Sequence, residues 1–247
     1  MSIRLDRYLA DVHVGTRKMI RQYIMDGRVK VNGAVANRTD TRVEIAHDTV
    51  EMDGKPLVYS KYRYIMLNKP AGAVSATKDG LSRTVIDLLQ NVRVRGLFPV
   101  GRLDKDTEGL LLLTDDGDLA HRLLSPKKNV DKTYEAHLLT PVTDDDLQKL
   151  AEGVDIGDDT PTLPAGVTRA EKDDRGREVV LLTIREGRFH QVKRMFHAVG
   201  SEVVFLRRLS MGVLQLDPGL KPGAFRNLSA DEIALLKQDA AGGTGPE

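Results

Sequence analysis

The chain has 247 residues, of which 40% are hydrophobic and 30% charged, and its formal net charge is only +1, so it lacks the overall basic excess common among nucleic-acid-binding proteins. The absence of cysteine excludes disulfides and thiolate metal sites. No segment reaches the roughly 18 apolar residues of a membrane span, and the first residues lack the apolar run of a signal peptide, so we expect a soluble, cytoplasmic protein.

Residues 1–58 form the first predicted unit, two helices followed by short strands. Apolar residues at helical spacing cover residues 2–12, and a second helix follows the N-cap residue Thr16 and ends before Gly27. This second helix has an apolar arc, formed by Met19, Ile20, Tyr23 and Ile24. It also has a basic arc, formed by Arg17, Lys18 and Arg21. Asn32-Gly33 and Asp53-Gly54 predict tight turns between strands.

The rest of the chain mixes strands and helices without regular alternation, which favours an α+β fold. Residues 59–64 are expected to be a linker, residues 65–236 a second domain, and residues 237–247 a mobile tail. Strands are predicted over 64–69, 132–139, 178–187 and 203–216, and helices over 84–92, 119–126, 189–200 and 229–239. Ser229 and Glu232 form the capping-box pattern that opens the last helix.

Charge is segregated along the sequence. Residues 1–38 carry eight Lys or Arg and three acids, and residues 185–208 carry six basic residues and two acids. Residues 139–178 carry eleven acids and five basic residues. One face could therefore attract a polyanion while another repels it, although ordinary solvated surface is the alternative.

The stretch "GRLDKDTEGLLLLTDDG", residues 101–117, is the most unusual in the chain. Counted from Asp104, carboxylates fall at positions 1, 3, 5 and 12 with a glycine at 6, close to a calcium-binding EF-hand loop. Glu108 and Asp115 depart from that pattern, four leucines leave no polar ligand at position 9, and no helix precedes the loop. Calcium binding is therefore disfavoured.

A structural interpretation explains most of these acids. Leu110 to Leu113 are expected to form a buried strand, and the following Asp115, Asp116, Gly117 and Asp118 its turn. It does not explain why Arg102-Leu103-Asp104 stands just before the strand. On a strand, Arg102 and Asp104 would point to the same face and could enter one cleft.

Residues 1–58 resemble the S4 RNA-binding domain, in "RLDRYLA", "TRKMIRQYIMDGRVKVNG" and "VEIAHDTVEMDG". The remainder resembles the pseudouridine synthases, whose Gly-Arg-Leu-Asp signature carries the catalytic aspartate, and it also contains "MLNKPAG", "KTYEAHL" and "EGRFHQVKRMF" in the family's order. The form "HQVKRM", behind an S4-like domain, is closest to the RsuA type that modifies one uridine of 16S rRNA. The resemblance implies a catalytic domain with a mixed, largely antiparallel sheet flanked by helices.

The resemblance also implies roles for particular residues. Asp104 would be the catalytic carboxylate, Tyr134 would stack on the uracil, and Lys193 would be the basic residue beside Asp104, with Arg194 as the alternative. RNA would be bound by a further set, in which Arg102 fills the gap left by the flipped base: Arg17, Lys18, Arg21, Arg102, Arg188 and Arg194. His190 and His197 lack a metal-ligand partner set, and we expect no metal site.

The function implied is isomerisation of a uridine to pseudouridine in 16S rRNA, of the uridine-516 type, by base flipping and an aspartate-dependent rearrangement of the glycosidic bond. The reaction implies no cofactor. The expected partner is 16S rRNA within a small-subunit assembly intermediate, with no membrane, and the chain is expected to be a monomer. The alternatives are a synthase for 23S rRNA and a non-catalytic RNA-binding or ribosome-assembly protein.

Overall fold

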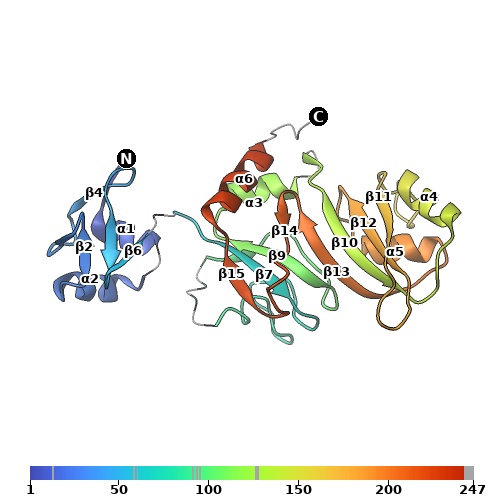
Figure 1. The fold of residues 1–247 in the computed structure, drawn as a ribbon, viewed down its shortest axis with the longest axis horizontal. Helices are drawn as coiled ribbons and strands as arrows, with labels where there is room; N and C mark the ends of the chain where they lie inside the picture. The colour runs from blue at the N-terminus through green and yellow to red at the C-terminus, as the bar shows by residue number, and fades with distance from the viewer. Residues whose placement is uncertain are drawn as a thin grey trace. The chain divides into compact units, whose positions relative to one another are not determined.

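The computed structural model describes residues 1–12, 14–57, 59, 61–90, 92, 94, 96–125 and 128–241. It divides into two compact units, Met1–Arg63 and Tyr64–Glu247 (Figure 1). The division falls at the end of the segment expected to be a linker. Across the described ranges, no helix has the length and apolar character needed to span a bilayer.

The first unit begins with β1 (Ser2–Arg4), α1 (Leu5–Asp11) and α2 (Arg17–Met25). Five short strands follow: β2 (Val29–Val31), β3 (Ala34–Val35), β4 (Arg42–Glu44), β5 (Val50–Met52) and β6 (Lys55–Leu57). β1 pairs with β4, and the others form an antiparallel sheet in the order β3-β2-β5-β6. Both predicted tight turns are present, since Asn32, Gly33, Asp53 and Gly54 all have positive φ.

Helix α2 shows how the sequence pattern builds this unit. Thr16 caps it by accepting a hydrogen bond from the Met19 amide at 3.3 Å, as predicted. Ile20 and Ile24 are buried in the core of the unit, but Met19 is 44% exposed and does not belong to the buried arc. The first predicted helix is also shorter than expected, because Ser2–Arg4 extend to pair with β4.

The second unit is built on a nine-stranded sheet. Its strands are β7 (Tyr64–Lys69), β8 (Phe98–Pro99), β9 (Glu108–Thr114), β10 (Lys132–Leu138), β11 (Gly166–Ala170), β12 (Val179–Ile184), β13 (Val203–Met211), β14 (Leu214–Gln215) and β15 (Phe225–Asn227). Its helices are α3 (Gly117–Leu124), α4 (Asp144–Glu152), α5 (Gln191–Ala198) and α6 (Ala230–Ala241).

The main path of this sheet is β11-β12-β10-β13-β9-β7-β15, with β8 paired to β9 and β14 to β13 (Figure 1). β13 and β9 are parallel, and every other pairing between these strands is antiparallel. The structure therefore confirms the predicted α+β class and the mixed, largely antiparallel sheet.

Two predicted elements differ from the structure. In place of the helix predicted over 84–92, the described part of the segment forms bends and turns, although Thr84 and Asp87 exchange the two hydrogen bonds of a capping box. At the other end, the predicted Ser229–Glu232 capping box is present, but α6 continues to Ala241. Residues 237–241 are thus helical, and residues 242–247 of the predicted tail lie outside the described residues.

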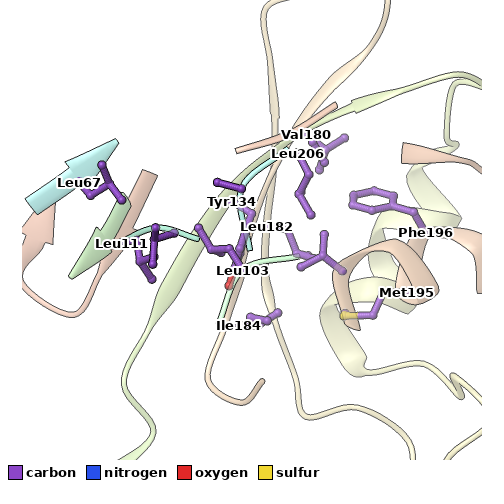
Figure 2. Close-up of a cluster of buried hydrophobic side chains, with 14 of the residues drawn as sticks. Leu67, Leu103, Leu111, Tyr134, Val180, Leu182, Ile184, Met195, Phe196 and Leu206 are labelled. Carbon is purple, nitrogen blue, oxygen red and sulfur yellow. The ribbon is translucent and has the colours of Figure 1, made fainter. Parts of the chain in front are cut away.

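The core of the second unit lies between one face of the sheet and α5. Figure 2 shows Met195 and Phe196 of α5 directed toward Val180, Leu182 and Leu206 of the sheet. Met195, Phe196, Val180 and Leu182 are fully buried. This packing fixes the first turns of α5, and with them Lys193, relative to β10 and β13.

Candidate active site

Asp104 lies in the loop that leads from β8 into β9. Leu103 is buried and anchors this loop, since the Ser75 hydroxyl donates to its carbonyl at 2.8 Å and accepts from its amide at 3.0 Å. Residues 102–104 were expected to be extended like a strand, but in the structure they belong to this loop and form no strand. Arg102 and Asp104 nevertheless line one pocket, together with Leu103 between them.

Gly109, which follows the acidic loop, occupies a position where only glycine fits. Its φ is +100°, and a Cβ atom at this position would lie 2.3 Å from the carbonyl oxygen of Arg208. Any other residue would push β9 away from β13, the parallel partner with which Gly109 is in register. The glycine thus lets β9 start against β13 immediately after the Asp104 loop.

Lys193, in the first turn of the core-packed helix α5, forms an ion pair with the Asp104 carboxylate. Its Nζ lies 3.4 Å from Asp104 Oδ2 and 2.6 Å from Asp106 Oδ1. Burial opposes ionisation of Asp106, but the Lys193 ammonium outweighs it and lowers the pKa of Asp106. Lys193 is therefore the basic residue beside Asp104, as the resemblance implied, and it is shared with a second carboxylate.

His190 lies on the other oxygen of the same carboxylate. Its Nε2 is 3.6 Å from Asp104 Oδ1, and the residue adopts a left-handed conformation with φ +50° just before α5. Left-handed backbone is uncommon for residues other than glycine and tends to occur where function requires it. No role was predicted for His190, whereas in the structure it lies on the pocket wall.

Tyr134 of β10 forms another part of the pocket wall. It is only 8% exposed and lies among Leu103, Leu182 and Leu206 (Figure 2). Its register partner on β12 is Leu182, which belongs to the same core cluster. Tyr134 is thus both a core residue and a pocket residue.

Lys69, in the "NKP" segment, is a functional candidate that the sequence analysis did not single out. The side chain is fully buried, and its ammonium donates to the carbonyls of Pro70, Lys105 and Thr107 at 3.1, 3.2 and 2.8 Å. Burial lowers the pKa of Lys69 to about 8, and nearby Asp106 is the strongest of the charges opposing that shift. Lys69 therefore stabilises the loop that carries Asp104, through hydrogen bonds to the backbone carbonyls of that loop.

The three arginines proposed to bind RNA in this unit differ in their surroundings. Arg102 is exposed at the pocket. Arg188 also lines the pocket, but its guanidinium donates to the Thr160 and Pro161 carbonyls and pairs with Glu186. Arg194 pairs with Asp158 and donates to a main-chain carbonyl, and it is not part of the pocket lining. The last two arginines thus brace the residue 156–161 loop against α5.

The acidic residues after the leucines have no place in this pocket. β9 spans seven residues, roughly 20 Å or more of extended chain, so Asp115 lies far from Asp104 and the two cannot share a calcium ion. Asp116 is not an ordinary turn residue, as it caps α3 by accepting from the Leu119 amide and accepts a hydrogen bond from the buried Tyr64 hydroxyl. In the part of the chain that is described, no three His, Asp or Glu side chains are grouped to hold a metal.

The basic arc predicted on α2 is exposed. Arg17, Lys18 and Arg21 are all exposed, whereas Ile20 and Ile24 of the same helix are buried. Ordinary solvated side chains would have the same exposure, so an RNA contact by this arc stays a prediction.

Both parts of the chain match known protein families. The model of the RNA pseudouridylate synthase family matches residues 63–198, and that of the S4 domain matches residues 3–50.

Curated relatives match over nearly the whole chain. An uncharacterised RNA pseudouridine synthase of Bacillus subtilis is 47% identical over 97% of this chain and 100% of its own length. Ribosomal small subunit pseudouridine synthase A is 43% identical in Vibrio vulnificus, over 94% of this chain and 98% of the relative. The Escherichia coli protein of the same name is 40% identical over 95% of this chain and its own full length. A crystal structure of a pseudouridylate synthase aligns with a TM-score of 0.65 and 38% identity, covering 95% of this chain and 99% of that chain.

Proposed function

We propose that this chain, which belongs to the RNA pseudouridine synthase family, converts one uridine of 16S ribosomal RNA to pseudouridine. Its relatives in Vibrio vulnificus and Escherichia coli are named for the small ribosomal subunit, and they align with almost the whole chain. The observation that carries the chemistry is the Asp104 carboxylate, held between Lys193 and His190 at the wall of a pocket that also contains Tyr134.

The reaction breaks the N1–C1′ bond of uridine and forms a C5–C1′ bond, while a proton leaves C5 and N1 gains one. As N1 departs with the bonding electrons, positive charge develops at C1′. A carboxylate at that carbon stabilises the charge, as in glycoside cleavage. After the base has turned, the same carboxylate is placed to accept the C5 proton. Asp104 supplies this group without any cofactor.

The neighbouring residues prepare Asp104 and the base for this step. Lys193 and His190 lie 3.4 and 3.6 Å from the two carboxylate oxygens, and in this proposal they keep the group oriented when charge develops. The Tyr134 ring, buried on one side by Leu103 and Leu182, offers a flat surface to the uracil in the pocket. Arg102 is exposed at the pocket and, in this proposal, occupies the space that the flipped base leaves in the RNA.

The S4-type unit supplies binding away from the reacting base. Arg17, Lys18 and Arg21 of α2 are exposed cations that can contact phosphates, which fix position without reading sequence. In this proposal the target is the uridine-516 type of site, in the cytoplasm. Action as a monomer on a small-subunit assembly intermediate stays a prediction.

The test is pseudouridine mapping across all rRNA from a strain that lacks this protein, with and without the gene restored. We expect a single 16S position to lose pseudouridine and to regain it on restoration. A lost position in 23S rRNA instead would contradict the 16S assignment while keeping the chemistry. If every rRNA position stays modified, an rRNA substrate is contradicted.

A further inference from the structure

Phe189 is a large apolar side chain that the packing of the second unit does not use. It is 73% exposed, although it directly precedes the strained residue His190 at the start of α5. The Phe189 and His190 rings stack, with centroids 3.8 Å apart and planes 19° from parallel. One face of the phenyl ring is therefore covered by His190, and the high exposure leaves the other face open.

This pair is continuous with the active site. His190 lines the pocket and lies 3.6 Å from Asp104, so the order outward from the carboxylate is Asp104, His190 and then Phe189. The open face of Phe189 is thus one aromatic ring beyond the pocket wall. A group lying flat on it would be a near neighbour of whatever occupies the pocket.

The substrate provides such a group. When a uridine leaves its stack to enter the pocket, each flanking base loses a stacking partner. Aromatic side chains commonly replace that partner in single-stranded RNA, because every base has a π-face and stacking does not depend on its sequence. An exposed ring beside the pocket fits this requirement better than an exposed aliphatic side chain would.

We propose that Phe189 is a stacking platform for the base adjacent to the flipped uridine, with His190 supporting the ring from behind. The proposal rests on the pseudouridine synthase activity of the chain and not on the choice between 16S and 23S rRNA. Phe189 binds substrate in this account and takes no part in bond rearrangement. Its loss should therefore weaken RNA binding more than turnover.

The test uses the full chain and an rRNA fragment that the wild-type protein is first shown to convert. Phe189→Ala and Phe189→Leu should raise KM by about fivefold or more, since base–aromatic stacking corresponds to roughly 5- to 150-fold in affinity. Phe189→Tyr and Phe189→Trp should keep KM within about twofold of wild type. Leu139→Ala, which changes a side chain 61% exposed just after β10, is the matched control and should have no effect.

A direct readout accompanies these kinetics. The same RNA, carrying a photoreactive 5-iodopyrimidine immediately 5′ or 3′ of the target uridine, should crosslink at one of these positions to the peptide containing Phe189. Phe189→Leu should lose that crosslink while the RNA is held at saturating concentration. The proposal requires both results. A KM of Phe189→Ala within twofold of wild type, or crosslinks that bypass residue 189 at both flanking positions, would overturn it.

Discussion

Lys193→Met removes the cation that the structure places beside Asp104, the carboxylate proposed to be catalytic. The two charges are 3.4 Å apart, which gives about 5 kcal/mol of attraction at an effective dielectric constant of about 20. Both side chains are about one quarter exposed, so solvent screens part of that energy. The hydrogen bond of Lys193 goes to Asp106, so for Asp104 we take only the screened charge–charge attraction, roughly 1.5–3 kcal/mol.

If that energy acts on the transition state, kcat should fall by about 10- to 150-fold. The assay is single-turnover conversion on saturating RNA, which separates chemistry from binding. Lys193→Arg keeps the charge and should recover part of the rate. Asp106→Asn is the matched control. Asp106 is 73% exposed and competes for Lys193, and its replacement leaves the Lys193–Asp104 pair intact. Its rate should stay within about threefold of wild type.

An equally slow Asp106→Asn variant would show that the second carboxylate, and not Asp104, depends on Lys193. A rate for Lys193→Met within threefold of wild type would refute the reasoning altogether. In that case the ion pair would be a surface contact of little energetic weight.

Three further predictions concern stability and binding. Burial lowers the pKa of Lys69 to about 8, so between about pH 8 and 10.5 the unfolded chain binds more protons than the folded chain. In urea titrations, the free energy of unfolding of wild type should therefore rise by about 2 kcal/mol between pH 7 and 9.5, relative to that of Lys69→Met. No relative change would contradict this. Asp116→Ala should lower the free energy of unfolding by about 2–4 kcal/mol, through the lost helix cap and the lost hydrogen bond from the buried Tyr64 hydroxyl, whereas the exposed Asp118→Ala should change it by less than about 1 kcal/mol. The three basic residues of α2 are Arg17, Lys18 and Arg21. Replacing all three by alanine should reduce the slope of log K against log salt, where K is the binding constant for rRNA, by about two to three units. An unchanged slope would mean that they form an ordinary solvated face.

Local signals in the sequence were sufficient where local forces decide the structure. Thr16, Ser229 and the two Xaa-Gly turns were placed correctly because a cap or a left-handed turn depends on a few adjacent residues. The helix predicted over 84–92 did not form even though Thr84 and Asp87 make the hydrogen bonds of a capping box, so a helix-start signal was not sufficient there. Ser2–Arg4 form a strand that was not predicted, because the partner strand β4 lies about 40 residues later in the chain.

The site was predicted in part. Asp104, Tyr134 and Lys193 were identified through the family motifs, and the structure brings them to one place. His190 and Lys69 were not identified, because their roles come from contacts across the fold. Lys69 meets the Asp104 loop through backbone carbonyls that no sequence pattern marks, and His190 reaches Asp104 only through its unusual backbone conformation. A lysine within an otherwise buried strand was the one available signal for Lys69.

The central claim is that the Asp104 carboxylate performs the rearrangement, and Asp104→Asn tests it most directly. Pseudouridine formed on the rRNA fragment that wild type converts should be measured alongside the affinity of the variant for the same RNA. The account predicts no detectable pseudouridine and an affinity within a few-fold of wild type, since phosphate contacts dominate RNA binding. Turnover by Asp104→Asn within tenfold of wild type would contradict the account.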